Sequence, residues 1–216
     1  MPGRSRSRPW APPNPPPNPP PNPPANPPGA HFLTDRALIA ELVRASGASQ
    51  ATLVFDLGAG YGALTGPLAR TGAHVIAVER DPSLARQLRR RFSDDPRVGV
   101  VEDDLRRLPW PRRPFQVVAS PPFALTTLLC RRLLGDDAVP LAGADLILAW
   151  GAAKWLSGAP RDRQTERWAA RYEIRLVRRV AAASFSPPPG TDVAYVRIRP
   201  RPGRPGGPRG PRRRRG

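Results

Sequence analysis

Short apolar runs of strand type alternate with segments of helical periodicity along the middle of this chain. The strand-type runs lie at 52–58, 74–79, 97–104, 115–120 and 144–150, and two later ones at 172–185 and 192–200. Apolar residues recur at helical spacing in 34–46, 62–72, 82–92 and 124–135. Because parallel strands need a crossover between them, this alternation predicts an α/β fold: a parallel, Rossmann-like sheet with helices on both faces and a closing pair of strands.

The two ends of the chain have compositions that do not suit a packed core. Residues 1–29 are almost wholly Pro, Asn and Ala in an NPP repeat, which favours extended polyproline II. Residues 200–216 are Arg, Gly and Pro without apolar periodicity, so we expect disorder there. Residues 30–199 are then a single domain of ordinary size.

Positive charge gathers at both ends. The formal net charge is +18, and twelve of these charges come from three arginines before residue 30 and nine from Arg197 onward, with no acid in either stretch. Arginine-rich, acid-free ends suit a polyanion such as RNA, because neutralised phosphates release counterions. GC-rich codon usage is the alternative, since Lys154 is the single lysine.

Cysteine content and hydropathy predict a cytoplasmic protein. Cys130 is the single cysteine, so an internal disulfide is excluded, and its apolar neighbours suggest a buried thiol. The longest apolar stretch, LAGADLILAW, contains Asp145 and is too short to span a bilayer. The arginines near the start precede Pro and Asn, unlike a signal peptide. The sequence holds no Cys/His cluster that predicts a metal, and a monomer is the default expectation.

A glycine-rich segment, FDLGAGYGALT, follows the first strand-type run of the alternation. Gly58, Gly60 and Gly62 allow a tight turn and the close approach of a ligand to the backbone. Gly58, Gly60 and Ala63 also satisfy the relaxed dinucleotide pattern, and Glu79 follows where a ribose-binding acid belongs. This segment alone therefore leaves a nicotinamide-dependent oxidoreductase open.

Two acids favour S-adenosylmethionine over a dinucleotide. Asp56 stands two residues before Gly58 in the D-x-G-x-G-x-G form, and Asp104 ends the third strand, where it could accept a hydrogen bond from an adenine amine. A carboxylate attracts the cationic methionine end of S-adenosylmethionine, whereas it would repel the anionic pyrophosphate of a dinucleotide. A turn-capping or ordinary loop acid is the alternative for each. An oxidoreductase would also need a proton-transfer residue, for which the chain offers only His31 and His74.

The segment SPPF, after the fourth strand, predicts chemistry at an exocyclic amine. The lone pair of an adenine amine is delocalised into the ring, so an enzyme must accept hydrogen bonds from its N–H groups and aim the nitrogen at the methyl donor. Ser120 would be the side-chain acceptor, the Pro121 carbonyl the second acceptor, and Phe123 the face on which a flipped base stacks.

These motifs, in this order, resemble those of the rRNA adenine-N6 methyltransferases. That family includes the Erm-type 23S rRNA enzymes of macrolide resistance and the 16S dimethyladenosine transferases. The resemblance runs from AHFLTD through DLGAGYGALT, AVERD, VVEDDLRRLPWP and SPPFALTT to FSPPPGTDVAYVRIRP. It implies that the segment of His31, Phe32 and Leu33 borders the cofactor. It also implies that the segments of Gly58, Glu79 and Asp104 hold its methionine, ribose and adenine parts.

The chain departs from the family pattern in two places. Ser120 replaces the usual Asn; its hydroxyl is a shorter acceptor and also a donor. After VRIRP only an Arg-rich stretch follows in this sequence, so we expect the helical domain that usually follows the sheet in this family to be largely absent. The resemblance implies methylation of a 23S rRNA adenine in preference to 16S, with macrolide resistance as its result. The alternatives are a 16S adenine dimethyltransferase, a DNA adenine methyltransferase, and an RNA-binding member with weakened catalysis.

Overall fold

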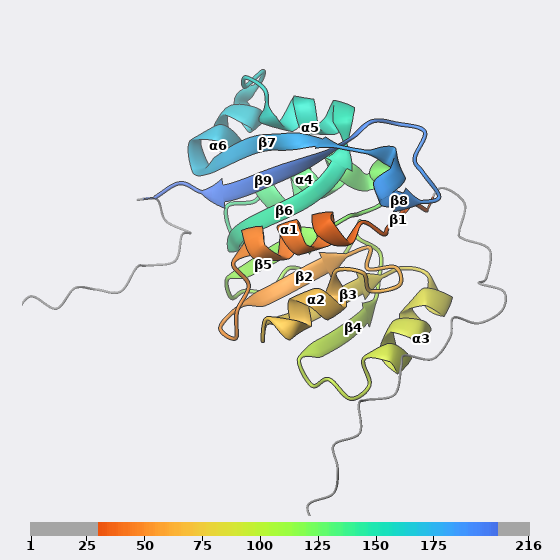
Figure 1. The fold of residues 1–216 in the computed structure, drawn as a ribbon. Coiled ribbons are helices and arrows are strands. Elements are labelled where there is room, and N and C mark those ends of the chain that lie inside the picture. Colours follow the sequence, from red (N-terminus) through yellow and green to blue (C-terminus); the bar gives the residue numbers. More distant parts are fainter. Residues whose placement is uncertain (1–29, 203–216) are drawn as a thin grey trace, which may run out of the picture.

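The computed structural model describes residues 30–202. The segment 1–29 and residues 203–216 of the predicted tail lie outside them, and Pro200 is the last residue of a strand rather than the first of the tail. A seven-stranded sheet has the order β4-β3-β2-β5-β6-β9-β7, in which β9 is antiparallel to both neighbours and the first five strands are parallel. The α/β prediction is confirmed (Figure 1). No helix among the described residues is long and apolar enough to cross a membrane. The strands of this sheet are β2 (Leu53–Leu57), β3 (His74–Glu79), β4 (Val98–Glu102), β5 (Phe115–Ala119), β6 (Leu141–Ala149), β7 (Tyr172–Val180) and β9 (Val193–Pro200).

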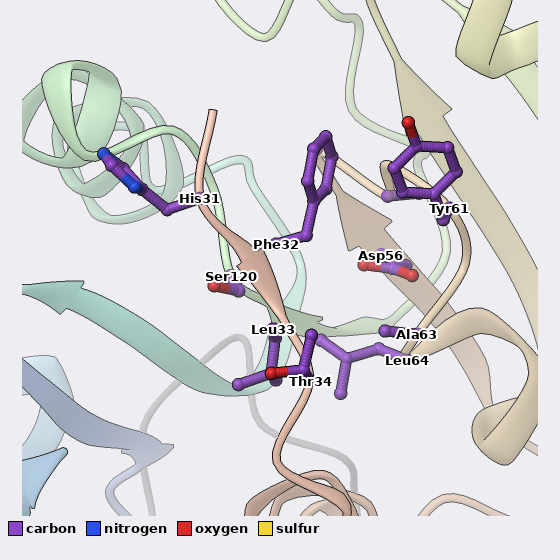
Figure 2. Close-up of a pocket in the computed structure, with 11 residues that line it drawn as sticks. His31, Phe32, Leu33, Thr34, Asp56, Tyr61, Ala63, Leu64 and Ser120 are labelled. Carbon is purple, nitrogen blue, oxygen red and sulfur yellow. The ribbon is translucent and has the colours of Figure 1, made fainter. Parts of the chain in front are cut away.

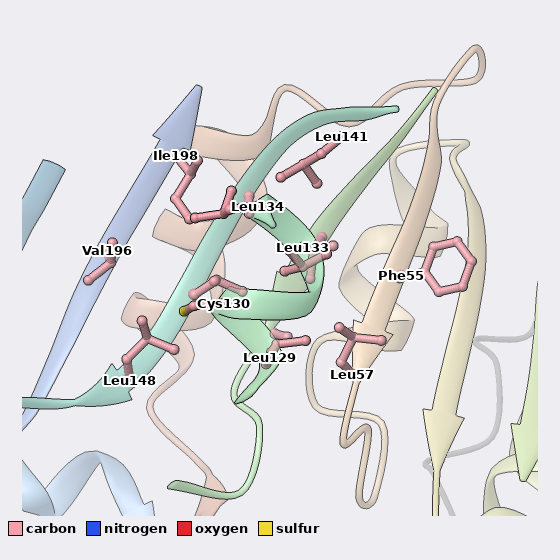
Figure 3. Packing of buried hydrophobic residues seen from close by; sticks show 14 of the residues in the cluster. Phe55, Leu57, Leu129, Cys130, Leu133, Leu134, Leu141, Leu148, Val196 and Ile198 are labelled. Atoms are coloured by element: carbon pink, nitrogen blue, oxygen red, sulfur yellow. The ribbon is translucent and has the colours of Figure 1, made fainter. Parts of the chain in front are cut away.

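Helices cover both faces of the sheet because successive strand residues point to opposite sides. On one face, Leu38 of α1 packs in a cluster with Val54 of β2; on the other, Leu129 of α4 packs with Phe55. Figure 3 shows the buried side of α4 against β2, β6 and β9. Cys130 lies in this layer, where burial raises the pKa of its thiol to about 12, so it is an inert core residue as expected. The first face carries α1 (Arg36–Ser46), α2 (Thr65–Arg70) and α3 (Pro82–Arg91), and the second α4 (Thr126–Leu134), α5 (Trp150–Ser157) and α6 (Arg163–Arg171).

Helix boundaries follow local chemistry. Asp35 caps α1, and its carboxylate accepts hydrogen bonds from the amides of Ala37 and Leu38 at 2.9 and 3.1 Å. Gly47 ends α1 in the left-handed conformation. The second helix begins only at Thr65, after the glycine turn, so Pro67 falls within its first turn, where a proline is tolerated.

Between β4 and β5 the chain forms a loop rather than a helix, and Trp110 fills the space. The indole stacks on Phe115 with ring centres 5.4 Å apart. Arg132 of α4 lies against Trp110 and donates to the carbonyls of Leu105 and Leu108, the second at 2.6 Å. One arginine thus fixes the loop that follows the predicted adenine-binding acid.

The last third of the chain differs from expectation in two respects. The strand predicted over 172–185 stops at Val180 and gives way to the 3-10 turn η2 (Ala182–Ser184) and β8 (Phe185–Ser186). That short strand pairs antiparallel with β1 (Phe32–Leu33) and brings the chain back across the carboxyl edge of the sheet. Helices α5 and α6, which the periodicity did not indicate, complete the second face.

The carboxylate of Asp145 is buried in the sheet, where a hydroxyl donates to it and two guanidinium groups balance its charge. Asp145 of β6 is 1 % exposed. Its carboxylate accepts hydrogen bonds from the Tyr195 hydroxyl at 2.5 Å and from Arg199 at 2.7 Å, and Arg197 approaches to 3.3 Å. Burial raises the pKa of Tyr195, so its hydroxyl keeps the proton that it donates. This network joins β6 to the antiparallel strand β9.

Candidate functional site

A cavity of about 150 Å³ opens at the carboxyl ends of β2 and β5 (Figure 2). It brings together five residues predicted from the sequence, His31, Leu33, Asp56, Gly58 and Ser120. Ligand pockets commonly measure about 300–1,000 Å³. The enclosed space therefore suits one end of a nucleoside cofactor, with the remainder on the neighbouring surface. The other lining residues are Phe32, Thr34, Ala59, Tyr61, Ala63 and Leu64.

The glycine loop and the SPPF loop touch. Gly58 has a φ of 74°, and a Cβ there would lie 2.9 Å from Cδ of Pro122 and 3.4 Å from Cα of Pro121. Gly60 has a φ of 54°, and its Cβ would lie 2.8 Å from the Phe32 ring. Both positions need glycine for conformation and for space. The predicted cofactor and catalytic segments therefore form one continuous wall.

Asp56 is a buried acid at the floor of the cavity. It is 1 % exposed, and the Thr65 hydroxyl donates to its Oδ2 at 2.6 Å. Burial, with a smaller contribution from the charge of Glu79, raises the pKa of Asp56 to about 7. A cation in the cavity would favour the ionised form of this carboxyl, so the site is electrostatically suited to a sulfonium or ammonium group.

Glu79 lies beside the cavity rather than in its lining. Its two carboxylate oxygens accept hydrogen bonds from the amides of Gly60 and Asp81, each at 2.9 Å. The side chain thus holds the glycine loop against the end of β3. A ribose-binding role for Glu79 stays a prediction.

Asp104 lies just after β4 and outside the cavity lining, with its carboxylate 3.9 Å from Arg80, the residue after Glu79. The amide of Asp103 donates to the carbonyl of Glu79 at 3.2 Å, which sets the end of β4 against that of β3. Arg106 binds the Asp104 carboxylate through its guanidinium at 2.6–3.0 Å and through its backbone amide at 2.9 Å. The Arg106 side chain holds the pKa of Asp104 down at about 2. This carboxylate is ionised, and an adenine amine would share it with Arg106.

Ser120 carries a buried hydroxyl without a hydrogen-bond partner. Its Oγ is fully covered and makes no hydrogen bond in the described residues, and the residue lines the cavity. Figure 2 shows the hydroxyl near the Phe32–Leu33 strand. A buried polar atom left unpaired is costly, and such exceptions often mark a ligand or catalytic role. The hydroxyl predicted to accept from a substrate amine therefore has no hydrogen bond within the described residues to give up.

Phe123 begins the 3-10 turn η1 (Phe123–Leu125) and has two aromatic neighbours. His31 stacks on it at 5.8 Å with a 16° angle between ring planes, and Phe185 meets it edge-on at 5.9 Å. The Nδ1 atom of His31 lies 3.0 Å from the carbonyl oxygen of Pro187. A base that stacks on Phe123 would meet or replace the imidazole of His31.

Phe32, in the segment that the resemblance places beside the cofactor, pairs at the cavity with Tyr61, which sequence reasoning missed. The rings of Phe32 and Tyr61 lie 4.7 Å apart, and both side chains appear together in Figure 2. Tyr61 stands between two glycines, a position where an aromatic side chain can lie over a ligand, and this signal was available in the sequence. Thr34 and Leu64 had no comparable signal, whereas Ala63 belongs to the relaxed dinucleotide pattern.

The family described as "Ribosomal RNA adenine dimethylase" matches residues 27–208. The chain belongs to this family. Its members are S-adenosylmethionine-dependent methyltransferases, which confirms the cofactor predicted from the sequence. The residues present fit that cofactor, because the glycine cradle, buried Asp56 and the unpaired Ser120 hydroxyl meet at one cavity.

The relatives of this family member include both rRNA specificities. "Ribosomal RNA small subunit methyltransferase A" of Synechococcus sp. (strain JA-3-3Ab) is 36% identical over 185 residues, which cover 81% of this chain and 66% of the relative. "Mycinamicin-resistance protein MyrB" of Micromonospora griseorubida is 36% identical over 166 residues, 76% of this chain and 52% of the relative. The crystal structure of the 23S rRNA methyltransferase ErmE superposes with a TM-score of 0.72 at 29% identity, covering 79% of this chain and 70% of ErmE. The chain thus spans about two thirds or less of these two sequence relatives.

Proposed function

We propose that the protein methylates the exocyclic N6 amine of an adenine in 23S rRNA, and that this methylation confers resistance to macrolide-type antibiotics. Family membership supports adenine in rRNA as the substrate. The likeness to ErmE and to a mycinamicin-resistance protein supports the 23S target. The small-subunit relative keeps 16S rRNA as the alternative substrate.

The bound cofactor would supply an electrophilic methyl group on a sulfonium. The wall of β1 and the glycine loop would hold its methionine end, with Asp56 offsetting the positive charge. Glu79 and Asp104, at the ends of neighbouring strands β3 and β4, would hold its ribose and adenine. These two acids lie on the same edge of the sheet, as a single extended ligand requires.

The chain's own chemistry is the orientation of the amine. The Ser120 hydroxyl accepts one N–H of the adenine and the Pro121 carbonyl accepts the other, so the nitrogen lone pair is aimed at the methyl group. Pro121 and Pro122 stiffen this loop, and Gly58 packs against it, so little ordering is needed when the base binds. The unpaired buried hydroxyl of Ser120 is the observation that carries this proposal.

The test measures transfer of radiolabel from S-adenosylmethionine to protein-stripped 23S and 16S rRNA. Parent, Ser120→Ala and Ser120→Asn are compared, with Thr126→Val as matched control, since the Thr126 hydroxyl is also buried and unpaired but does not line the cavity. We expect label in 23S adenine, a loss of about 100-fold in Ser120→Ala, and retention in Ser120→Asn.

Other outcomes separate the alternatives. Label in 16S rRNA alone would replace the 23S assignment and leave the chemistry intact. RNA binding without label in the parent, restored by Ser120→Asn, would identify a member whose catalysis is weakened at this residue. No label and no cofactor binding in any variant would remove the methyltransferase assignment.

A further inference from the structure

Trp150 and Arg179 form a stacked pair at the catalytic edge of the sheet. The Arg179 guanidinium carbon lies 4.2 Å from the Trp150 ring centre, whereas the other five arginine–ring pairs of the described residues measure 5.2–6.0 Å. At 4.2 Å the guanidinium lies over the ring face. Arg179 is also 3.5 Å from Asp192, an exposed pair of the kind that contributes little to stability.

The outer side of this pair is open to solvent. The Arg179 side chain is 65 % exposed, while Trp150 is half-buried and packs on the α4–α6 side of the core. The backbone amide of Trp150 donates to the carbonyl of Asp192 at 2.8 Å, which fixes the main chain of Trp150 at the start of α5. The ring therefore holds an exposed guanidinium plane in a fixed place, and nucleic-acid bases stack on such planes.

The position of the pair relative to Ser120 follows from the strand order. Along the carboxyl edge, the glycine loop follows β2, Ser120 follows β5 and Trp150 follows β6, and these strands are neighbours in that order. Direct methyl transfer needs the attacking nitrogen and the leaving sulfur on opposite sides of the methyl group. With the donor on the β2 side of Ser120, the substrate base lies on the β6 side, which is where Trp150 stands.

We propose that Arg179, held flat by Trp150, stacks on and neutralises the nucleotide next to the target adenine. This inference rests on the proposed RNA substrate and adds a binding subsite to it. A flipped base leaves its neighbours unstacked, and a planar cation beside the active site replaces part of the lost stacking. Asp192 is displaced when the phosphate of that nucleotide takes its place.

The same strand supplies a matched control. Arg179 pairs with Ala194, whose side chain belongs to the α4–α6 layer, whereas Arg175 pairs with Arg197 toward the opposite end of β7. Arg175 is exposed and carries the same charge. Its replacement removes one positive charge from the same strand without touching the pair.

The experiment measures the dissociation constant for protein-stripped 23S rRNA by filter binding, together with KM and kcat for methyl transfer. The variants are Arg179→Ala, Arg179→Lys, Trp150→Leu and Arg175→Ala. We expect Arg179→Ala to weaken RNA binding about tenfold, with Trp150→Leu similar, because one stacked base is lost. Arg179→Lys keeps the charge but not the plane, so it restores binding only in part. The kcat at saturating RNA and the affinity for S-adenosylmethionine stay unchanged.

Equal effects of Arg179→Ala and Arg175→Ala, or full recovery in Arg179→Lys, would overturn the stacking proposal. Unfolding midpoints in urea identify a variant that fails through stability, and Arg179→Lys keeps the test decisive if Trp150→Leu unfolds. Because RNA binding is measured without turnover, a parent that binds RNA and transfers no methyl group would contradict the proposed function and leave this subsite testable.

Discussion

Gly58 and Pro122 are packed so closely that a Cβ on the glycine would lie 2.9 Å from the proline Cδ. One residue belongs to the loop after β2 and the other to the loop after β5, two neighbouring parallel strands. Any displacement of the first loop is therefore transmitted to the second. We therefore expect the predicted cofactor loop and the predicted catalytic loop to move together.

This contact predicts that the Cβ added by a Gly58→Ala substitution lowers the enzyme activity. Gly58→Ala should reduce methyl transfer about 100-fold, because the proline loop must shift by a fraction of an ångström or more. The control is Gly47→Ala, at a glycine with a similar φ of 65° and no atom within 4 Å of the added Cβ. It should cost about 1 kcal/mol of stability and leave activity near the parent value. Labelled transfer and urea unfolding of both variants provide the measurement, and equal activities would contradict the coupling.

Asp56 predicts an unusual dependence of stability on pH. Its pKa is raised from 3.8 to about 7 by burial, so the folded protein binds this proton more tightly than the unfolded chain. The contribution to the free energy of unfolding is then complete below about pH 4 and is lost as the pH rises toward 7, by up to roughly 1.4 kcal/mol per pH unit.

The Asp56→Asn variant isolates this contribution. An amide keeps an acceptor for Thr65 and does not titrate, so its unfolding free energy should fall less than the parent's between about pH 5 and 7. Urea titrations at several pH values compare the two slopes. Parallel curves would show that Asp56 is not protonated in the folded state.

The buried network on β6 predicts a large stability effect from one charge. Asp145→Asn leaves Arg197 and Arg199 without their shared anion and should lower the free energy of unfolding by about 3–5 kcal/mol. Glu41→Gln breaks a more exposed ion pair, with Arg178, and should cost no more than about 1 kcal/mol. Urea unfolding measures the loss of unfolding free energy in both variants. Similar losses would mean that the charge of Asp145 is not balanced by Arg197 and Arg199 as the geometry indicates.

The hydrogen bonds from Arg132 are expected to hold the loop between β4 and β5 in place. Arg132→Met keeps the apolar stem but removes the donors to Leu105 and Leu108, and should cost about 2 kcal/mol. Hydrogen exchange should speed up in residues 103–114 before the rest of the sheet. Arg131→Met, on the exposed side of the same helix, is the control. If hydrogen exchange in Arg132→Met sped up equally throughout the sheet, Arg132 would not act locally on this loop.

The parallel strands β2 to β6 could be predicted from local pattern because they are nearly continuous apolar runs. All five residues of β2 are buried, and the glycine turn after it has a signature of its own. The cap at Asp35 and the late start of α2 likewise depend on residues a few positions away. Each of these features is decided within one stretch of about ten residues.

The missed features depend on distant contacts or weak periodicity. Helix α6 buries only Thr165 and Trp168, so it shows little of the repeating apolar pattern that marks α1. Trp150 is the first residue of α5, although the apolar run before it predicted a strand through residue 150. The pairing of β1 with β8 has no local signal, because its partners are far apart along the chain.

That pairing also decides when the site can exist. Ser184 donates to Asp35 across 149 positions of sequence, and the amide of Thr34 donates to the carbonyl of Ser184. At about 5–20 residues per second of synthesis, roughly 8–30 s separate the appearance of the two halves. Residues 31–34 therefore cannot complete their side of the cavity until nearly the whole domain has been translated. A nascent chain on the ribosome contains the glycine turn long before it can form the complete binding site for the methyl donor.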